Sequence, residues 1–172
     1  VLMTPTEVVA FWFDEVTPAQ WWAKSDAFDR LVSSRFGSAH AAATRGELYA
    51  WRATADGRLA EIIVLDQFSR NIHRGMALVL AQEAVAAGLD RALDVGRRAF
   101  LYMPYMHSES AAIHALAVRL FATPGMEGNL DFERRHQAVI ERFGRYPHRN
   151  AVLGRTSTPA ELEFLKTPGS AF

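Results

Sequence analysis

The sequence contains no cysteine, which excludes disulfides, thiol catalysis and zinc sites built on sulfur. No apolar run approaches the roughly 20 residues that a membrane-spanning helix requires. The N-terminus lacks the basic and then apolar pattern of a signal peptide. Formal net charge is zero, with 19 basic and 19 acidic residues, which argues against bulk binding to nucleic acid or to a membrane. These absences together predict a cytoplasmic protein.

The sequence also lacks the glycine patterns GxGxxG and GxxxxGK[ST], so neither a dinucleotide fold nor a phosphate-binding P-loop is supported. What it contains is ordinary for a globular protein, with 49% hydrophobic and 11% aromatic residues in a length of 172. A chain of this length buries roughly 70% of the surface that it exposes when unfolded. We therefore predict a single domain over residues 1–172.

Apolar residues recur at intervals of three and four, and no segment alternates as a half-buried strand would. The pattern predicts an all-α fold of about eight or nine helices. Thr4-Pro5-Thr6-Glu7 has the form of a capping box with proline at the first helical position. The first helix should therefore begin here and end at about Glu15. Thr158-Pro159-Ala160-Glu161 repeats this signature before the last short helix.

Glycine and proline predict where several other helices end. A helix capped by Ser25 or Asp26 should stop at Gly37. Pro104 should hold the chain extended ahead of a new helix that Ser108 or Glu109 caps. Further boundaries come from composition. The residues 59–68 form the most apolar segment and predict a central helix, although 62–65 also fit a buried strand. A loop at 128–129 should precede a helix over 130–143.

The segment Arg142–Arg155 concentrates positive charge, with four arginines and a histidine but no acidic residue. Guanidinium groups on a segment interrupted by glycine and proline either bind an anion or attach an irregular connection to carboxylates and carbonyls elsewhere. The carboxylates that we expect as partners are Asp66, Glu109 and Glu141. Asp66 and Arg70, four residues apart on one helix, are expected to form a salt bridge.

Our first hypothesis is a pocket for a small anionic ligand, a carboxylate or phosphate, which is either a binding site or a catalytic one. Histidine titrates near neutral pH, so His107 or His136 would be the acid or base if a reaction occurs. The predicted ligand-binding residues carry charged or amide side chains and are Asp66, Arg70, Asn71, Glu109, Arg145, His148, Arg149 and Asn150. No metal site and no cofactor are predicted, because the histidine spacing matches no metal-binding motif.

Two alternatives remain open from the residues alone. The chain could be a non-catalytic interaction module that binds a protein or peptide in a helical groove. The arginine segment would then be a structural latch. The cluster could also be such a latch in a protein whose function lies in another part of the chain.

Four motifs resemble the bacterial domain-of-unknown-function family 924: LDQFSRNIHRG (65–75), YMPYMHSE (102–109), RFGRYPHRNAVLGR (142–155) and STPAELEFL (157–165). The resemblance covers nearly the whole chain and implies a helical fold similar to tetratricopeptide repeats, with no established activity. The chain departs from the family pattern at Ser69, Gln82 and His114, where proline, an acid and glutamine are usual. A ligand that touched these positions would meet a different site in this chain.

Overall fold

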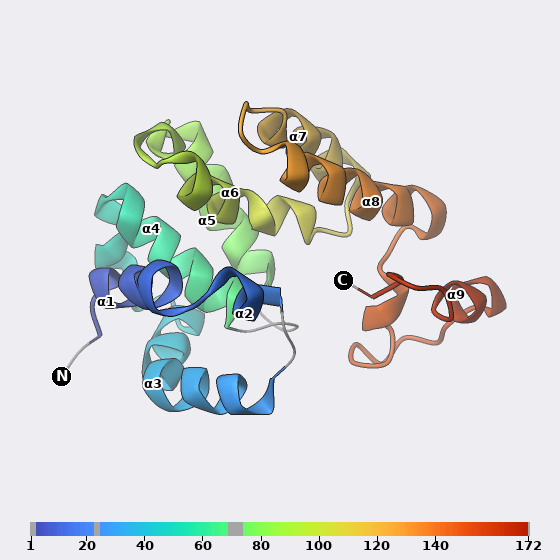
Figure 1. The fold of residues 1–172 in the computed structure, drawn as a ribbon, viewed down its shortest axis with the longest axis horizontal. Coiled ribbons are helices and arrows are strands. Elements are labelled where there is room, and N and C mark those ends of the chain that lie inside the picture. The colour runs from blue at the N-terminus through green and yellow to red at the C-terminus, as the bar shows by residue number, and fades with distance from the viewer. Residues whose placement is uncertain (1–2, 23–24, 69–73, 172) are drawn as a thin grey trace. The chain divides into compact units, whose positions relative to one another are not determined.

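The computed structural model describes residues 3–22, 25–68 and 74–171, and the side chains of all of these except 74–76. Its described residues form nine α-helices and no strand, which confirms the predicted all-α class (Figure 1). The α-helices are α1 (Pro5–Ala10), α2 (Pro18–Trp22), α3 (Asp26–Thr44), α4 (Ala55–Ile62), α5 (Arg74–Ala86), α6 (Val95–Met106), α7 (Ala111–Phe121), α8 (Glu127–Phe143) and α9 (Pro159–Phe164). Short π or 3₁₀ segments are η1 (Phe11–Glu15), η2 (Tyr49–Ala53), η3 (Ile63–Gln67), η4 (Leu89–Ala92) and η5 (Pro147–Arg149).

The chain divides into two compact units, Val1–Pro104 and Tyr105–Phe172, which we describe separately as unit 1 and unit 2. The single domain and the likeness to tetratricopeptide repeats remain predictions. Among the described residues, no helix is long and apolar enough to cross a membrane.

Unit 1 is built around α4 and its π-helical continuation η3. Every residue from 59 to 66 is buried, so the predicted central helix is confirmed and the alternative strand is wrong. The helices α1 and α5 contact α4, and α3 contacts η3. The capping box predicted at Thr4 and Glu7 starts α1, and the helical path continues through η1 to Glu15 as predicted.

Gly37 does not end a helix, contrary to the prediction, because α3 continues through it to Thr44. The buried side chains of α3 are Val32, Phe36, Ala39 and Ala43, a stripe at helical spacing on both sides of the glycine. Glycine costs only about 1 kcal/mol in a helix interior. Continuous burial along the stripe outweighs that local cost.

Pro104 lies inside α6 and not in an extended segment, so this prediction is also wrong. An interior proline removes one helical hydrogen bond and costs about 3 kcal/mol. Its neighbours Leu101, Met103, Tyr105 and Met106 are all buried. Burial of one such side chain contributes about 1.5–3 kcal/mol, so the apolar run keeps the helix intact.

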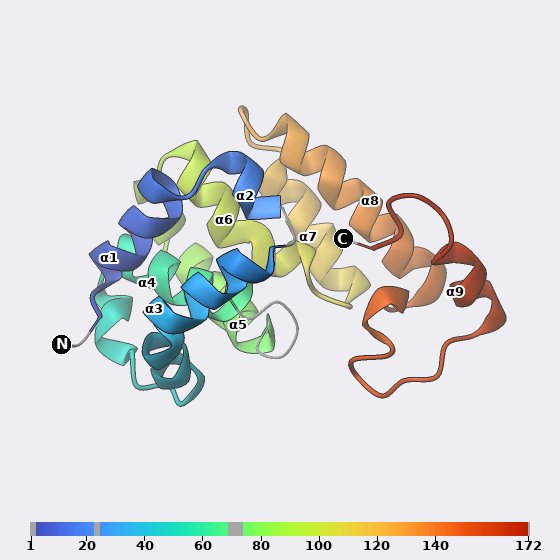
Figure 2. The ribbon, with the colours of Figure 1, turned by 60° about the horizontal axis from the view of Figure 1, so that its bottom comes forward.

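In unit 2, a short connection joins α7 to α8, and the two helices lie side by side in both views (Figures 1 and 2). The N-cap of α7 is Ser110, two residues after the predicted Ser108 and one after the predicted Glu109. The helix α8 begins at Glu127, so residues 128–129 are helical and not the predicted loop. Gly144 ends α8 with a φ of 69°, and the capping box predicted at Thr158 and Glu161 starts α9.

Candidate functional site

The facing sides of α7 and α8 bury polar side chains where apolar ones would be usual. His114 on α7 and both Glu133 and His136 on α8 are buried. The segment after α8 adds a buried tyrosine and an arginine to this region. We call the group the Tyr146 cluster, and its members are His107, His114, Glu133, His136, Tyr146, His148 and Arg149.

A chain of short hydrogen bonds runs through the centre of the cluster. The hydroxyl of Tyr146 donates to the carbonyl oxygen of Met106 at 2.6 Å. The Nε2 atom of His114 lies 2.9 Å from the carbonyl oxygen of Ser108 and 3.2 Å from the Tyr146 hydroxyl. A carbonyl oxygen only accepts, so Nε2 of His114 carries the proton. Its Nδ1 atom is then the one that faces Glu133, at 2.6 Å from Oε1.

Burial favours the protonated form of Glu133. The side chains of His114 and Glu133 are both fully buried, and burial raises the pKa of Glu133 above its usual value despite the opposing hydrogen bond from His114. No described residue donates to the second carboxyl oxygen of Glu133. A charged oxygen in that position would be costly, which adds to the preference of this carboxyl group for its protonated form. Helical spacing could have identified Glu133, because it lies three residues before His136 and seven before Ile140 on the buried face of α8.

His136 is neutral and has a defined tautomer. Its Nδ1 atom lies 2.8 Å from the carbonyl oxygen of Phe132, so Nδ1 donates and Nε2 is the accepting atom. Only 5% of its surface is exposed, and burial is the main reason that its pKa falls from 6.5 to about 3. The hydrogen bond to Phe132 opposes this fall, while the nearby basic side chains of His107, His114 and Arg149 add to it.

Arg149 connects three parts of the cluster. Its Nη1 atom donates to the carbonyl oxygen of His107 at 2.9 Å. Its guanidinium carbon lies 4.4 Å from the centre of the Tyr146 ring, which is a cation–π distance. The His107 and His136 rings are 6.4 Å apart, and the His148 ring is 5.6 Å from that of Tyr146. Four predicted site residues, His107, His136, His148 and Arg149, therefore come together in unit 2.

Glu109, which was predicted to bind a ligand, is bound by an arginine side chain and a backbone amide. It receives two hydrogen bonds from Arg155, at 2.7 and 2.9 Å, and one from the backbone amide of Tyr146 at 2.8 Å. Burial by itself raises the pKa of Glu109, but these hydrogen bonds outweigh burial and the pKa is lowered. Glu109 was expected to be a partner of the arginine segment, and the arginine that it binds is Arg155.

Arg145 binds Glu161 through two nitrogens, at 2.6 and 2.9 Å, and also donates to the carbonyl oxygen of Thr156. Glu161 was expected only as the capping residue of the last helix. It does cap, because it accepts from the amide of Thr158 at 2.7 Å. The hydrogen bond from Arg145 is the main reason that the pKa of Glu161 is lowered. We call the pairs Arg145–Glu161 and Arg155–Glu109 the latch.

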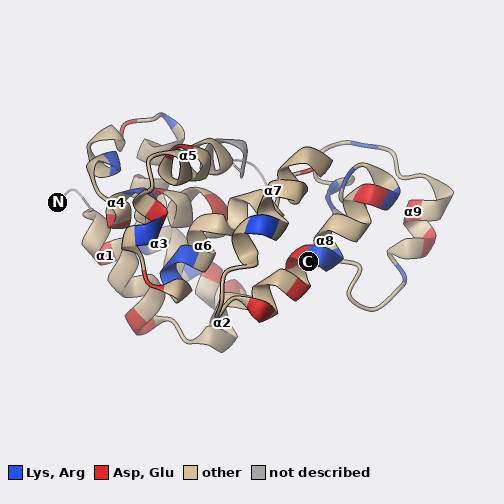
Figure 3. Ribbon diagram, turned by 90° about the horizontal axis from the view of Figure 1, so that it is seen from above, with Lys and Arg blue, Asp and Glu red and all other residues tan. Residues whose placement is uncertain are grey.

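Asn150 bonds to the segment that leads to α9. Its Nδ2 atom donates to the hydroxyl of Ser157 at 3.0 Å, across the turn that joins η5 to α9. Arg142 lies on the surface, with its guanidinium carbon 4.7 Å from the Phe143 ring and 5.7 Å from that of Phe164. Acidic and basic positions are intermixed along this part of the ribbon (Figure 3).

Asp66 lies in unit 1, where it is buried and accepts a hydrogen bond from Nε2 of Gln67 at 2.6 Å. Arg70 and Asn71 lie outside the described residues, and so does the expected salt bridge between Asp66 and Arg70. Among the described side chains, no group of three or more histidines and carboxylates is placed to hold a metal ion.

The comparisons identify relatives but no activity. The model of the family described as "Bacterial protein of unknown function (DUF924)" matches residues 8–169. A solved structure of a protein of unknown function from Agrobacterium tumefaciens is 36% identical, with a TM-score of 0.88. That match covers 94% of this chain and 96% of the other. No match is found among proteins with curated descriptions.

Proposed function

The chain belongs to the bacterial family of unknown function DUF924, and we propose that it binds a small carboxylate or phosphate through His107, His136 and Arg149. The observation that carries this proposal is the charge around His136. The basic side chains of His107, His114 and Arg149 lie near it and disfavour its protonation. The same positive field favours an anion at that position.

The chemistry of the three side chains suits such a ligand. Arginine presents a planar fork that binds carboxylate and phosphate oxygens through two parallel hydrogen bonds. With Nδ1 of His136 donating to Phe132, its Nε2 atom is the accepting ring nitrogen. We propose that it accepts from a hydroxyl or a protonated oxygen of the ligand. The latch offsets the charges of Glu109 and Glu161 locally, because Arg155 and Arg145 hold them in double hydrogen bonds.

If the site is catalytic, His107 suits the role of acid or base better than His136 does. A general base works best when its pKa lies near the working pH. With a pKa of about 3, His136 is a weak base near neutral pH and serves as an acceptor that orients the ligand. Binding alone does not require this step, so the proposal stands on the ligand and not on a reaction.

The test is thermal unfolding of the purified chain at pH 7.5 in sodium phosphate, in sodium succinate and in sodium chloride of equal ionic strength. We expect phosphate or succinate to raise Tm above its value in chloride, because a ligand that binds only the folded state stabilises it. Arg149→Lys should lose that increase. Arg142→Gln is the matched control, since it removes an exposed arginine from the same segment, and it should keep the increase.

The outcome that contradicts the proposal is equal stabilisation of wild type and Arg149→Lys by phosphate and succinate. His136→Asn provides a second check, because the asparagine amide can replace Nδ1 in the bond to Phe132. This variant should fold and bind the anion more weakly. Unchanged anion binding by both variants would leave no role for the three side chains.

The second candidate is the non-catalytic interaction module, with the arginines acting as the latch. Val152, Leu153 and Leu162 favour it, because these apolar side chains of unit 2 are about half exposed or more. Replacing all three by serine should then abolish partner binding without changing the response to phosphate. An anion-dependent Tm that requires Arg149 favours the first candidate.

A further inference from the structure

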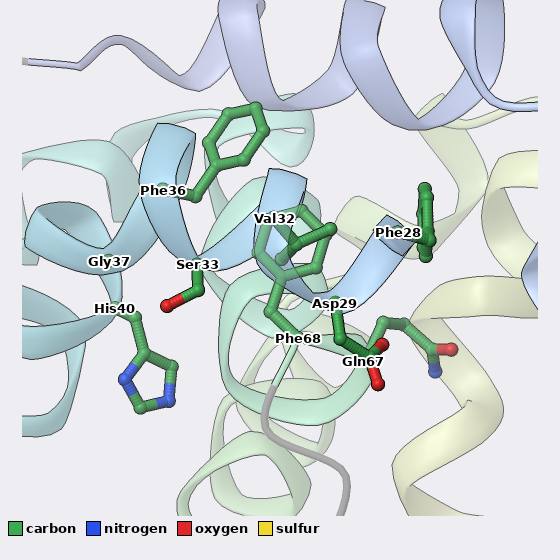
Figure 4. Close-up of a pocket in the computed structure, with 9 residues that line it drawn as sticks. All are labelled: Phe28, Asp29, Val32, Ser33, Phe36, Gly37, His40, Gln67 and Phe68. Atoms are coloured by element: carbon green, nitrogen blue, oxygen red, sulfur yellow. The ribbon is translucent and has the colours of Figure 1, made fainter. Parts of the chain in front are cut away.

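A second candidate site lies in unit 1 and is independent of the anion site. A hollow of about 360 Å³ opens between α3 and the end of η3. Its size is within the range of pockets that hold small organic molecules. The lining residues are Phe28, Asp29, Val32, Ser33, Phe36, Gly37, His40, Gln67 and Phe68 (Figure 4).

Three phenylalanines line the hollow. Phe36 is buried, while Phe28 and Phe68 are only partly buried. The Phe36 and Phe68 rings pack with centres 5.0 Å apart, and Val32 is a buried apolar side chain of the same lining. Phe68 lies in the middle of the lining, with Asp29 and Gln67 to one side and Ser33 and His40 to the other (Figure 4). The apolar part of a ligand therefore has ring faces to contact.

The orientation of Gln67 limits which polar groups the hollow offers. Its Nε2 atom donates to Oδ2 of the buried Asp66 at 2.6 Å. A carboxylate only accepts, so the amide nitrogen must face Asp66 and the carbonyl oxygen Oε1 is left as the other polar atom of the side chain. No described residue donates to Oε1. Asp66 thus fixes Gln67 as a hydrogen-bond acceptor in the lining.

Asp29 supplies the charge. Its carboxylate is exposed on the first turn of α3, and it has no ion pair among the described residues. Arg35 lies over the Phe36 ring, with its guanidinium carbon 5.2 Å from the ring centre, but it is held by two hydrogen bonds to Glu15 and does not line the hollow. Asp29 is therefore the acidic side chain of the lining, whose described residues include no arginine or lysine.

From these contacts we infer that the hollow binds a small organic cation, with a protonated amine at Asp29 and Gln67 Oε1 and an apolar body against the phenylalanines. An ammonium group satisfies both acceptors by donating N–H bonds, and it is attracted to aromatic faces. A carboxylate or phosphate ligand at the same place would be repelled by Asp29 and would receive no hydrogen bond from Gln67 Oε1, because both atoms only accept. The class of ligand is thus opposite in charge to that proposed for unit 2.

The test compares three ligands with the same phenyl body: phenethylamine, phenethyl alcohol and phenylacetate. At pH 7 these carry a positive, a neutral and a negative group respectively. Binding to the full chain is followed by changes in backbone amide resonances in ¹H–¹⁵N spectra. We expect phenethylamine to bind most tightly, with the largest changes at residues 28–40 and 67–68.

Asp29→Asn removes the charge and preserves the shape of the side chain, so its affinity for phenethylamine should fall about threefold to tenfold. Asp26→Asn is the matched control, because Asp26 is also exposed on the first turn of α3 and lies outside the lining. Its affinity should equal that of wild type. The inference is wrong if phenylacetate or the alcohol binds as tightly as the amine, or if Asp29→Asn binds the amine unchanged.

Discussion

The neutral state of His136 makes a prediction about acid stability. Its pKa is 6.5 in an ordinary environment and about 3 in the folded chain. Below pH 6.5 the unfolded chain therefore binds a proton that the folded chain does not, and the free energy of unfolding falls as the pH falls toward 3. At about 1.4 kcal/mol per pH unit, the complete loss is ~5 kcal/mol. The same relation gives a loss of ~1.4 kcal/mol at pH 5.5 and ~3 kcal/mol at pH 4.5.

The assay is urea unfolding of wild type and His136→Asn between pH 4.5 and 7.5. The asparagine amide keeps a donor for the Phe132 carbonyl oxygen but does not titrate. Subtracting the two curves removes the contributions of all other groups, so the difference isolates His136. We expect wild type to lose ~3 kcal/mol relative to the variant over this range.

A difference that stays constant with pH would refute this account of His136. It would mean that the histidine is protonated in the folded chain, or that it reaches water when the pH falls. The ¹⁵N shifts of the imidazole distinguish these cases, because a neutral ring retains a protonated Nδ1 and an unprotonated Nε2 at pH 5. A protonated ring at pH 5 would also remove the acceptor that we assign to the anion site.

Two further predictions concern glycine and the buried acid. Gly57→Ala should destabilise the chain by about 3 kcal/mol, because the added carbon would lie 1.9 Å from the Trp51 carbonyl oxygen. Gly37→Ala should instead raise the free energy of unfolding by about 0.5–1 kcal/mol. The carbon added at this position of α3 would have no atom within 4 Å apart from the adjacent helix backbone. Urea unfolding of both variants measures the contrast, and similar effects would contradict it. Glu133→Gln should gain stability relative to wild type as the pH rises above 4.5, because the raised folded pKa of Glu133 stabilises the folded chain only while the carboxyl is protonated. A difference that is independent of pH would show that the glutamate is not held neutral.

Local signals correctly predicted the beginnings of α1 and α9, but not those of α7 and α8. The capping boxes at Thr4 and Thr158 depend on side chains only three residues apart, and both form. The predicted helix interruptions at Gly37 and Pro104 were wrong because they relied on local preference alone. Their intrinsic preferences favour an interruption, but burial of neighbouring side chains along α3 and α6 decides the outcome. Burial on that scale depends on the packed structure and cannot be read from a single segment.

The sequence singled out some of the residues that the structure brings together, but not which acidic residue each arginine binds. His107, His136 and Arg149 were identified as residues that could work together, and their side chains lie in one cluster of unit 2. The carboxylate partners were less predictable. Arg145 and Glu161 are 16 residues apart, and Arg155 and Glu109 are 46 apart. No helical spacing connects such pairs, so charge alone could not show which arginine binds which acid.

The two interpretations of the arginine segment are compatible, because the latch can position the anion site. The carboxylate of Glu109 accepts hydrogen bonds from the amide of Tyr146 and from the side chain of Arg155. Glu109 therefore holds both ends of the segment 146–155. Arg145, the residue before Tyr146, is held by its ion pair with Glu161. Arg149 lies within this constrained turn, over the ring of Tyr146. A guanidinium group that is held in place before a ligand arrives loses less conformational freedom on binding, which increases affinity. The arginines that make the latch therefore serve the one that we propose to bind the anion.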